Sequence, residues 1–492
     1  MDNLPSEIGL PRTKSGVFCP IAVQASRHAE SPAVISDSNI WTYGQLNDLI
    51  CSEVIRWQSA PKKIVALSEW NSASLIVTLF AAWRVGSFVV LFNPKLPDST
   101  VLKIADSVGA QPISVTKELR IGMTEGRQID SIPPGKKRPD LPQINPQALA
   151  TAMLTSGSSG EPKLIVHSIA NHLASAKACA ERLEIGPGSD WLWSLPSFHA
   201  GGLAILWRCF TAGAAVRMMP HQTSLVNQLK SAPPTIVSLV PTQLNDLVEA
   251  KLKCPVVLQD VIVGGAPLSP SLLKAGLKLG YPIRTTYGST ETSSMVTLSN
   301  RWVAFSGELH AGLPLEGNTL EIGSGGRLSV QSESVSVGEF FRGVFVPRTI
   351  TPGKTAMYET QDHASVLTSG EICILSRTDD IIISGGENIS LVLVENTLML
   401  HPLVYACTTV GVEHPRFGMR PVAFVRLVED TSQQKSSINA DEHRLLMSFL
   451  ADKLPSYARP DYILAMPNLP DGALKITRVQ LQQIATLELK LP

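Results

Sequence analysis

The chain has 492 residues, which is too long for one compact core, so the sequence predicts two or more domains. Lysine plus arginine and aspartate plus glutamate each total 42, so there is no net basic field to hold a polyanion and we expect no nucleic-acid partner. The seven cysteines are scattered singly, without a CxxC pair or a zinc-type Cys/His cluster, which is typical of a reducing cytoplasm.

The N-terminal region carries acids and prolines where a secretory signal needs an uninterrupted apolar stretch, so we expect no signal peptide. The most apolar long segment, Ala73 to Phe92, is interrupted by Arg84 and Gly86. It therefore predicts a buried helix followed by a strand and not a membrane span. These features predict a cytoplasmic protein and leave open whether it is a monomer or a homo-oligomer.

Short apolar runs alternate with amphipathic helical stretches through much of the chain. This alternation predicts α/β layers with largely parallel sheets. Several of the runs end in polar, glycine-bearing turns, where open α/β sheets place their ligands. The runs that we expect to be strands are Ile64 to Leu67, Phe88 to Phe92, Trp191 to Leu195, Ile236 to Val240 and Val261 to Val263.

The composition and the hydrophobic pattern of the sequence change in its last third. Short strand-like runs with glycines and prolines from Ser324 to Cys373 predict a β-rich subdomain, and a separate compact unit follows Asp379. We place the boundary near Arg377 to Ile381, giving a large N-terminal domain, residues 1–378, and a small mobile α+β domain, residues 379–492. In the small domain we expect helices at Leu391 to Leu400 and Asp441 to Lys453, with strands at Thr408 to Val412 and Val422 to Leu427.

The segment Leu154 to Lys163, LTSGSSGEPK, joins small hydroxyl and glycine residues to a cation. Such a loop offers free backbone N–H groups that could cradle phosphates. Its spacing differs from the GxxxxGK[ST] P-loop, which disfavours a switch-type NTPase. A Ser/Gly loop alone is more often a linker, so the residues by themselves leave both interpretations open.

Thr155 to Lys163 resembles the phosphate loop of the adenylate-forming superfamily, which includes acyl-CoA ligases, luciferases and peptide-synthetase adenylation domains. Further segments resemble that family's motifs in the family's order between about Trp41 and Gln480. They are VGGA at Val263 to Ala266, YGSTET at Tyr287 to Thr292, Asp362, RTDD at Arg377 to Asp380, SGGENI at Ser384 to Ile389 and ALKITR at Ala473 to Arg478.

The resemblance implies an enzyme that uses ATP and Mg²⁺ to activate a carboxylic acid. Glu291 would bind Mg²⁺, although a Glu after Ser-Thr is as often a helix capping residue, and Thr290 would donate a hydrogen bond to the reacting groups. Asp362 and Arg377 would bind the ribose, and Tyr287 would flank the adenine. The remaining residues implied for ATP or AMP are Thr155, Ser156, Gly157, Ser158, Ser159, Gly160, Lys163, Gly264, Gly265, Ala266 and Gly288.

The resemblance also assigns roles in the small domain. Lys475 would be the catalytic cation of adenylation, because a mobile positive charge between the reacting oxygens offsets charge that develops in the transition state. Asp379 would be the hinge that lets one site later admit a thiol, and Gly385 and Gly386 would contact coenzyme A, the co-substrate. The sequence departs from the family pattern at Leu474, at Ser376 and at Thr360 to Asp362, which puts loop geometry in doubt but removes no functional side chain.

The middle of the chain narrows the choice of carboxylic acid substrate. Trp191 to Gly213 and Ser238 to Leu244 resemble the o-succinylbenzoate:CoA ligase branch of menaquinone biosynthesis, as do His167 and the segment from His172 to Ala176. That acid keeps a second, aromatic carboxylate, for which the buried Arg208 is suited, unless Arg208 pairs with a protein carboxylate instead. His199 and Ser238 would also line the acyl site, and a structural role is about as plausible for His199.

Three other functions remain open on the sequence. The nearest is an acyl-CoA ligase for another aryl or medium-chain acid. The second is an adenylation enzyme that loads a carrier protein instead of free coenzyme A. The third, a non-catalytic nucleotide-binding protein, is disfavoured because Glu291, Asp362, Arg377 and Lys475 are all present.

Overall fold

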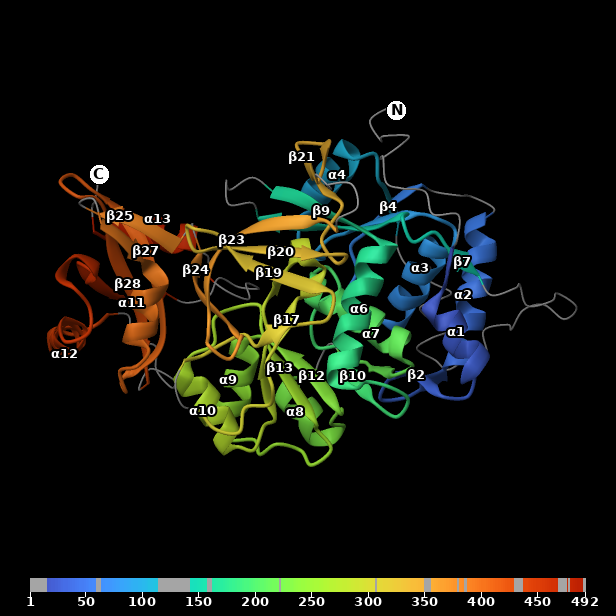
Figure 1. Cartoon of the computed structure of the whole chain (residues 1–492), viewed down its shortest axis with the longest axis horizontal. Helices are drawn as coiled ribbons and strands as arrows, with labels where there is room; N and C mark the ends of the chain where they lie inside the picture. The colour runs from blue at the N-terminus through green and yellow to red at the C-terminus, as the bar shows by residue number, and fades with distance from the viewer. Residues whose placement is uncertain are drawn as a thin grey trace, which may run out of the picture.

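The molecule consists of a large lobe and a small one, with the C-terminal residues forming the small lobe at the left of Figure 1. This arrangement confirms the predicted fold class of a large α/β domain followed by a small α+β domain. The structure is a computed structural model and describes residues 16–58, 63–113, 142–156, 162–220, 223–305, 308–348, 355–377, 380–384, 387–428, 437–467, 476 and 478–489.

The large lobe contains a seven-stranded sheet in the order β14-β13-β12-β10-β11-β2-β3. Its strands run parallel from β14 to β2, and only β3 is antiparallel to its neighbour. Three of these strands, β10, β12 and β13, overlap apolar runs that the sequence predicts to be strands. The strands are β2 Pro32–Ile35, β3 Ile40–Thr42, β10 Asp190–Leu192, β11 Ala215–Arg217, β12 Ile236–Leu239, β13 Asp260–Val263 and β14 Ile283–Thr285.

A second seven-stranded sheet has the order β22-β21-β9-β8-β5-β4-β6. The pairs from β8 to β6 are parallel, whereas β9, β21 and β22 continue the sheet as antiparallel strands. The expected strands at Ile64–Leu67 and Phe88–Leu91 are β4 and β5. The others are β6 Gln111–Ile113, β8 Leu149–Ser156, β9 Pro162–Ser168, β21 Gly338–Phe341 and β22 Val344–Pro347.

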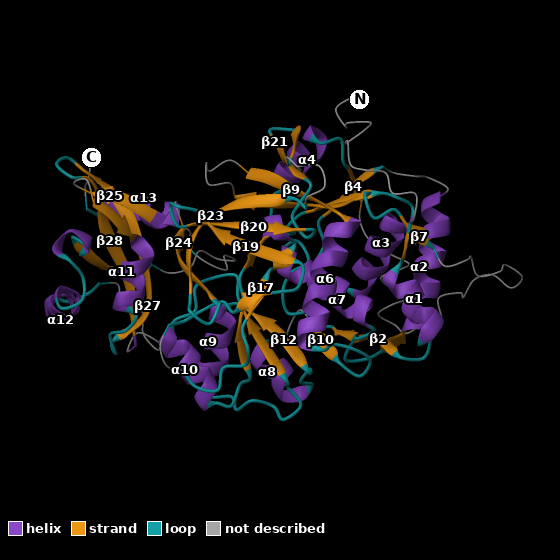
Figure 2. Cartoon of the chain, viewed as in Figure 1, coloured by secondary structure: helices purple, strands orange, loops and turns teal. Residues whose placement is uncertain are grey.

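Helices separate these two sheets, as Figure 2 shows for the purple ribbons of α3, α6 and α7. One hydrophobic cluster joins these helices to both sheets, and it includes Leu79, Trp207, Val89 and Trp191. The helices of the large lobe are α1 Pro20–Arg27, α2 Tyr43–Gln58, α3 Ala73–Arg84, α4 Asp98–Ser107, α6 Ile169–Leu183, α7 Ala200–Ala212, α8 Leu225–Ser231, α9 Pro241–Glu249 and α10 Pro270–Lys278.

The β-rich subdomain forms an antiparallel sheet in the order β19-β20-β23-β24. Its strands are β19 Asn318–Ile322, β20 Arg327–Ser332, β23 Met357–Val366 and β24 Ile372–Arg377. A short hairpin and one turn of 3₁₀ helix lie where the two seven-stranded sheets and their helices meet this subdomain. They are β15 Gly288–Ser289, η1 Thr290–Thr292 and β16 Ser294–Met295. The YGSTE motif therefore occupies a tight turn where the layers meet.

The small lobe is built around one five-stranded sheet with its own hydrophobic core. The expected strands and helices of this lobe are present, with β27 and β28 longer than predicted because the two form a continuous antiparallel pair. Its elements are β25 Ile381–Ser384, β26 Glu387–Ser390, β27 Val404–His414, β28 Gly418–Leu427, β29 Tyr462–Ala465, α11 Leu391–Leu398, α12 Ala440–Ala451 and α13 Arg478–Glu488.

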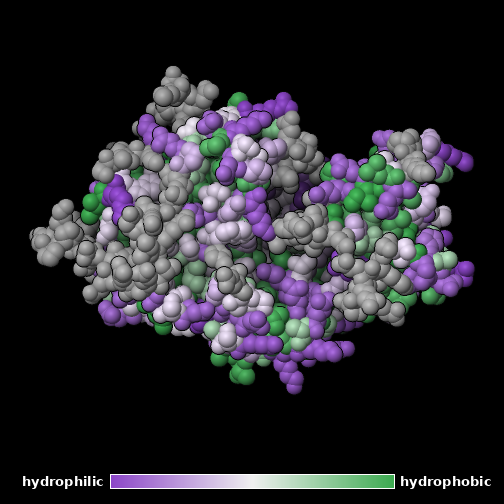
Figure 3. All heavy atoms as spheres, turned by 180° about the vertical axis from the view of Figure 1, so that it is seen from behind, coloured by the Kyte–Doolittle hydropathy of each residue, from purple (hydrophilic) through white to green (hydrophobic). Residues whose placement is uncertain are grey.

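The apolar segment from Ala73 to Phe92 forms α3 and β5, as its interruption at Arg84 and Gly86 predicts. Within the described ranges, no helix has both the length and the apolar character needed to cross a bilayer. All seven cysteines are free thiols. The face in Figure 3 mixes hydrophilic and hydrophobic residues, with a group of hydrophobic ones on the small lobe at the right.

Candidate active site

The phosphate-loop motif lies at the tip of a β-hairpin. Strands β8 and β9 pair antiparallel up to Thr155 opposite Lys163 and Ser156 opposite Pro162, so both ends of the expected loop belong to strands. The strands extend this far because Leu154 and Leu164 lie opposite each other and pack in one apolar cluster. Gly157, Ser158, Ser159 and Gly160 lie outside the described residues.

Lys163 lies between two carboxylates. Its Nζ is 3.0 Å from Glu339 Oε2 and 3.7 Å from Glu291 Oε1. Glu339 comes from β21, which pairs beside β9 with Phe341 opposite Lys163, so residues 339 and 163 lie on the same face of adjacent strands. Glu339 is not recognisable from the sequence, because no motif surrounds it and only the strand register brings it to Lys163.

The YGSTE motif forms a compact turn that presents Thr290 and Glu291. A Cβ at Gly288 would lie 2.0 Å from the carbonyl oxygen of Ser294, so only glycine fits there. Glu291 is 12% exposed. Burial and the nearby Glu291 carboxylate raise the pKa of Tyr358, a second residue of this site that no sequence motif marks.

Tyr287, Asp362 and Arg377 come together at the edge of the β-rich sheet. The Tyr287 hydroxyl donates a hydrogen bond to Asp362, and burial together with that carboxylate raises the pKa of Tyr287. Asp362 on β23 lies opposite Arg377 on β24, whose Nε is 3.6 Å from Asp362 Oδ1. Three residues implied for the nucleoside are thus adjacent, although the sequence separates them widely.

The VGGA turn packs directly before the YGSTE motif. It follows β13, and a Cβ at Gly264 would lie 2.6 Å from Thr286 Cγ2, so the two segments are in close contact. Gly265 has φ +77°, which favours glycine. Gly265 and Ala266 are exposed. This geometry suits a turn that a planar base approaches.

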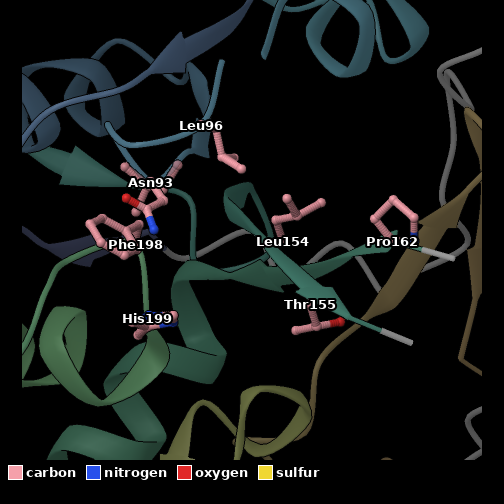
Figure 4. Close-up of a pocket in the computed structure, with 8 residues that line it drawn as sticks. Asn93, Leu96, Leu154, Thr155, Pro162, Phe198 and His199 are labelled. Carbon is pink, nitrogen blue, oxygen red and sulfur yellow. The ribbon is translucent and has the colours of Figure 1, made fainter. Parts of the chain in front are cut away.

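A cavity of about 230 Å³ opens beside the hairpin. In Figure 4 its labelled side chains come from three segments, which are the turn after β5, the β8–β9 hairpin and the start of α7. His199 precedes the first residue of α7, and its ring packs on Phe198 at 4.8 Å between centroids. The cavity is lined by Leu91, Asn93, Leu96, Leu154, Thr155, Pro162, Phe198 and His199.

Arg208 is buried in the middle of α7, at 1% exposure. Its Nη2 donates to Ser294 Oγ at 3.0 Å, and its guanidinium lies 5.4 Å from the centroid of the Trp191 ring. Among the described residues, Arg208 Nε has no hydrogen-bond partner and no carboxylate forms an ion pair with this arginine. Ser238 is linked to Arg208 through Trp191, because the Ser238 hydroxyl accepts a hydrogen bond from Trp191 Nε1 at 3.2 Å.

Four residues implied for the small lobe, Asp379, Gly385, Gly386 and Lys475, lie outside the described residues. Their neighbours form a network centred on Arg478, the first residue of α13. Arg478 forms ion pairs with Asp380 at 3.3 Å and with Glu395 at 2.9 Å, and it donates to the Thr409 carbonyl. Burial raises the pKa of Glu395 to about 7 against the opposing effect of Arg478.

The lobes also touch directly. The hydroxyl of Tyr405 on β27 hydrogen-bonds with Glu249 and Asn245 of α9. This contact joins the small lobe to α9, the helix that lies between β12 and β13 in the chain.

The site contains few protein ligands for a metal ion. No group of three or more His, Cys, Asp or Glu side chains suited to a metal occurs in the part of the chain that the structure describes. Mg²⁺ fits such a site, because it is commonly held by one or two carboxylates together with the phosphates of a substrate. Glu291 has the hard oxygen donors and the position beside Lys163 that this arrangement requires.

Comparison with known proteins gives consistent matches over nearly the whole chain. The profile "AMP-binding enzyme" matches residues 21–340, and "AMP-binding enzyme C-terminal domain" matches residues 393–473. A "2-succinylbenzoate--CoA ligase" of Salmonella typhimurium is 35% identical over 85% of this chain and 86% of the relative. The enzyme of that name from Escherichia coli is 29% identical over 85% of this chain and 87% of its own length.

Solved structures share the fold. The o-succinylbenzoate CoA synthetase (MenE) of Bacillus subtilis, in complex with the acyl-adenylate intermediate OSB-AMP, has a TM-score of 0.79 at 24% identity and covers 95% of this chain and 98% of that one. A variant of E. coli MenE with bound OSB-AMS has a TM-score of 0.77 at 25% identity, covering 97% and 100%. The chain therefore belongs to the family of AMP-binding, adenylate-forming enzymes, as its motifs predict.

Proposed function

We propose that this protein is an ATP-dependent ligase that converts 2-succinylbenzoate into its coenzyme A thioester, a step of menaquinone biosynthesis. The proposal rests on family membership and on a relative of that activity at 35% identity over 85% of the chain. The observation that carries the choice of acid is Arg208, a buried guanidinium whose described partners are a serine hydroxyl and an aromatic face.

A buried cation needs an anionic partner, because desolvation of the charge costs several kcal/mol. The described part of the chain supplies no carboxylate for Arg208, which argues against the alternative that it forms an internal ion pair. A substrate with a second carboxylate would supply that partner, and a guanidinium binds a carboxylate through two parallel hydrogen bonds. An acid that carries only the reacting carboxylate would leave the charge unpaired.

The first half-reaction uses the residues around Lys163. The carboxylate oxygen of the acid attacks the α-phosphorus of ATP, an acyl-phosphate bond forms, and pyrophosphate leaves. Lys163 and the hairpin residues Thr155 and Ser156 bind the β and γ phosphates, and Thr290 donates to the reacting oxygens. Glu291 holds Mg²⁺, which offsets phosphate charge when bound.

The nucleoside is held on the other side of the turn. Asp362 accepts hydrogen bonds from the ribose hydroxyls while Arg377 donates to them, and the Tyr287 hydroxyl keeps the Asp362 carboxylate in place. The VGGA turn, with Gly264 beside Thr286, contacts the adenine. Lys475, brought in by the small domain, neutralises the charge that builds up between the two substrates.

In the second half-reaction the thiol of coenzyme A attacks the acyl carbonyl carbon, the thiol proton passes to solvent, and AMP leaves. Rotation of the small domain, residues 379–492, about Asp379 brings Gly385 and Gly386 to the coenzyme. The free state of all seven cysteines supports action in the reducing cytoplasm.

The direct test is thioester formation with purified protein, ATP, Mg²⁺, coenzyme A and a panel of acids. We expect 2-succinylbenzoate to be preferred over benzoate, phenylbutyrate and octanoate. No turnover of 2-succinylbenzoate with turnover of another acid would overturn the choice of substrate. Pyrophosphate release without transfer to free coenzyme A would instead identify an adenylation enzyme that serves a carrier protein, and no acid-dependent pyrophosphate release would indicate a non-catalytic protein.

A further inference from the structure

The turn that carries Thr290 and Glu291 is strained and is held by residues from other elements. Ser293 has φ +54° and Ser294 has φ +101°, and two successive non-glycine residues in this region are energetically costly. Such a turn persists only when its surroundings hold it. Ser175 donates to the Ser293 carbonyl at 3.0 Å, and Ser293 itself donates to the Ser334 carbonyl at 2.7 Å.

Glu291 lies between two anchored peptide groups. The backbone N–H of Ser336 donates to the Glu291 carbonyl at 2.8 Å. On the other side, His167 Nε2 lies 2.7 Å from the Thr290 carbonyl oxygen. These two contacts fix the planes before and after the Glu291 Cα, so they also fix the direction in which its carboxylate leaves the backbone.

The state of His167 follows from its surroundings. A carbonyl oxygen only accepts, so Nε2 carries the proton and donates, and the ring is neutral with its lone pair on Nδ1. His167 is fully buried on β9, and burial lowers its pKa to about 4. Among the described residues Nδ1 has no partner, so the bond to Thr290 is the ring's single described hydrogen bond.

The ring of His167 is also held by packing. It lies 5.1 Å from the ring of His172, which stacks on Trp207 at 5.3 Å and is 2.7 Å from Thr151 Oγ1 through its own Nε2. His172 thus belongs to the same buried cluster without a described contact to the turn. A substitution of His172 is therefore a matched control for a substitution of His167.

We propose that His167 is a positioning residue for adenylation, which sets the Thr290–Glu291 turn for Mg²⁺ and ATP through the hydrogen bond to the Thr290 carbonyl. The inference rests on the proposed function of Glu291. It does not depend on which acid is activated, because the turn lies on the ATP side of the site. Loss of the donor should affect the step that uses the turn and leave the later thioester step intact.

The test compares His167→Met with His167→Gln. The two replacements have similar size and length, but only glutamine keeps an N–H donor near the position of Nε2. His172→Met serves as the control for loss of a buried ring in the same cluster. Two measurements are made on each protein: the shift in melting temperature caused by Mg²⁺ with ATP, which requires no acid, and the Mg²⁺ dependence of acid-dependent pyrophosphate release.

We expect His167→Met to raise the Mg²⁺ concentration for half-maximal pyrophosphate release about tenfold and to reduce the ligand-induced melting shift. The Thr290 carbonyl would lose one of its two described donors and keep only the Ser293 N–H at 3.1 Å. His167→Gln should recover most of both, and His172→Met should leave both near the wild-type values even if it melts earlier. Thioester formation from supplied acyl-adenylate should change less than twofold in all three variants.

Equal effects of methionine and glutamine at position 167, or parallel losses in both half-reactions, would overturn the proposal. If wild-type protein releases no pyrophosphate with 2-succinylbenzoate, the choice of acid fails, while the melting shift still tests His167. If His172→Met alters the Mg²⁺ dependence as strongly as His167→Met, the effect belongs to the packing of the cluster and the proposal is wrong.

Discussion

The ammonium group of Lys163 lies 3.0 Å from the carboxylate of Glu339, so the cation expected to bind the ATP phosphates is already paired with an acid of the neighbouring strand. ATP must compete with that pair and approach a negative charge. Glu339→Gln should therefore lower the KM for ATP two- to fivefold, since a partly exposed ion pair contributes about 0.5–1 kcal/mol.

Steady-state kinetics at saturating Mg²⁺ measure this effect. Asp441→Asn, which removes an exposed carboxylate paired with Arg444 on α12, is the control for a change in net charge. An increase in the KM for ATP would mean that Glu339 holds Lys163 in its productive position instead of competing with the phosphates.

Arg208 provides the test of acid recognition. Arg208→Met keeps most of the apolar stem and removes the charge, so kcat/KM for 2-succinylbenzoate should fall about 100-fold, equivalent to about 3 kcal/mol. An analogue without the aromatic carboxylate should lose much less. Ser294→Ala removes the described hydroxyl partner of Arg208 but keeps the positive charge. This control therefore distinguishes the effect of losing the charge from the effect of losing the hydrogen bond that holds the guanidinium. A uniform loss for both acids would indicate damaged packing.

Lys475 should act in only one half-reaction. Lys475→Ala should slow adenylation by about 10²–10³-fold, the usual effect of removing a group that stabilises developing charge. Thioester formation from supplied acyl-adenylate should remain near the wild-type rate, because the proposed rotation about Asp379 would move this lysine out of the site. Comparable losses in both half-reactions would contradict two domain orientations. Lys453→Ala on the same lobe is the control.

The stability of the large lobe should depend on pH through His167. Its folded-state pKa of about 4 lies below the ordinary value of 6.5, so the folded protein favours the neutral ring. The stabilisation is fully present above pH 6.5 and is lost as the pH falls toward 4, by about 3 kcal/mol at most. Denaturant unfolding at pH 7.5 and 5 should show a smaller decrease for His167→Gln than for wild type. Equal decreases would mean that other groups account for the pH dependence.

Much of the fold was predictable because its signals are local. The apolar runs at Ile64 and Phe88 form strands, and the interrupted segment after Ala73 forms a helix and a strand. These elements follow from periodicity and breakers, which need no knowledge of tertiary contacts.

The contacts within the site depended on the tertiary structure. Glu339 reaches Lys163 only through the pairing of β21 with β9, and no local pattern specifies that register. The described partners of Arg208 likewise depend on how α7 packs against Trp191 and Ser294. The sequence also indicated a loop where β8 and β9 pair as far as Ser156, since glycine and serine composition says little about where a hairpin stops.

Arg478 limits how far Lys475, the proposed catalytic lysine, can lie from Asp379, the proposed hinge. It joins the start of α13 to Asp380, the residue next to Asp379, and to Glu395. Lys475 precedes this anchored residue by three positions, and three residues of extended chain span only about 10 Å. In the proposed mechanism Lys475 would therefore move together with the small lobe, and rotation about Asp379 would change the effective concentration of this lysine at the reacting phosphate.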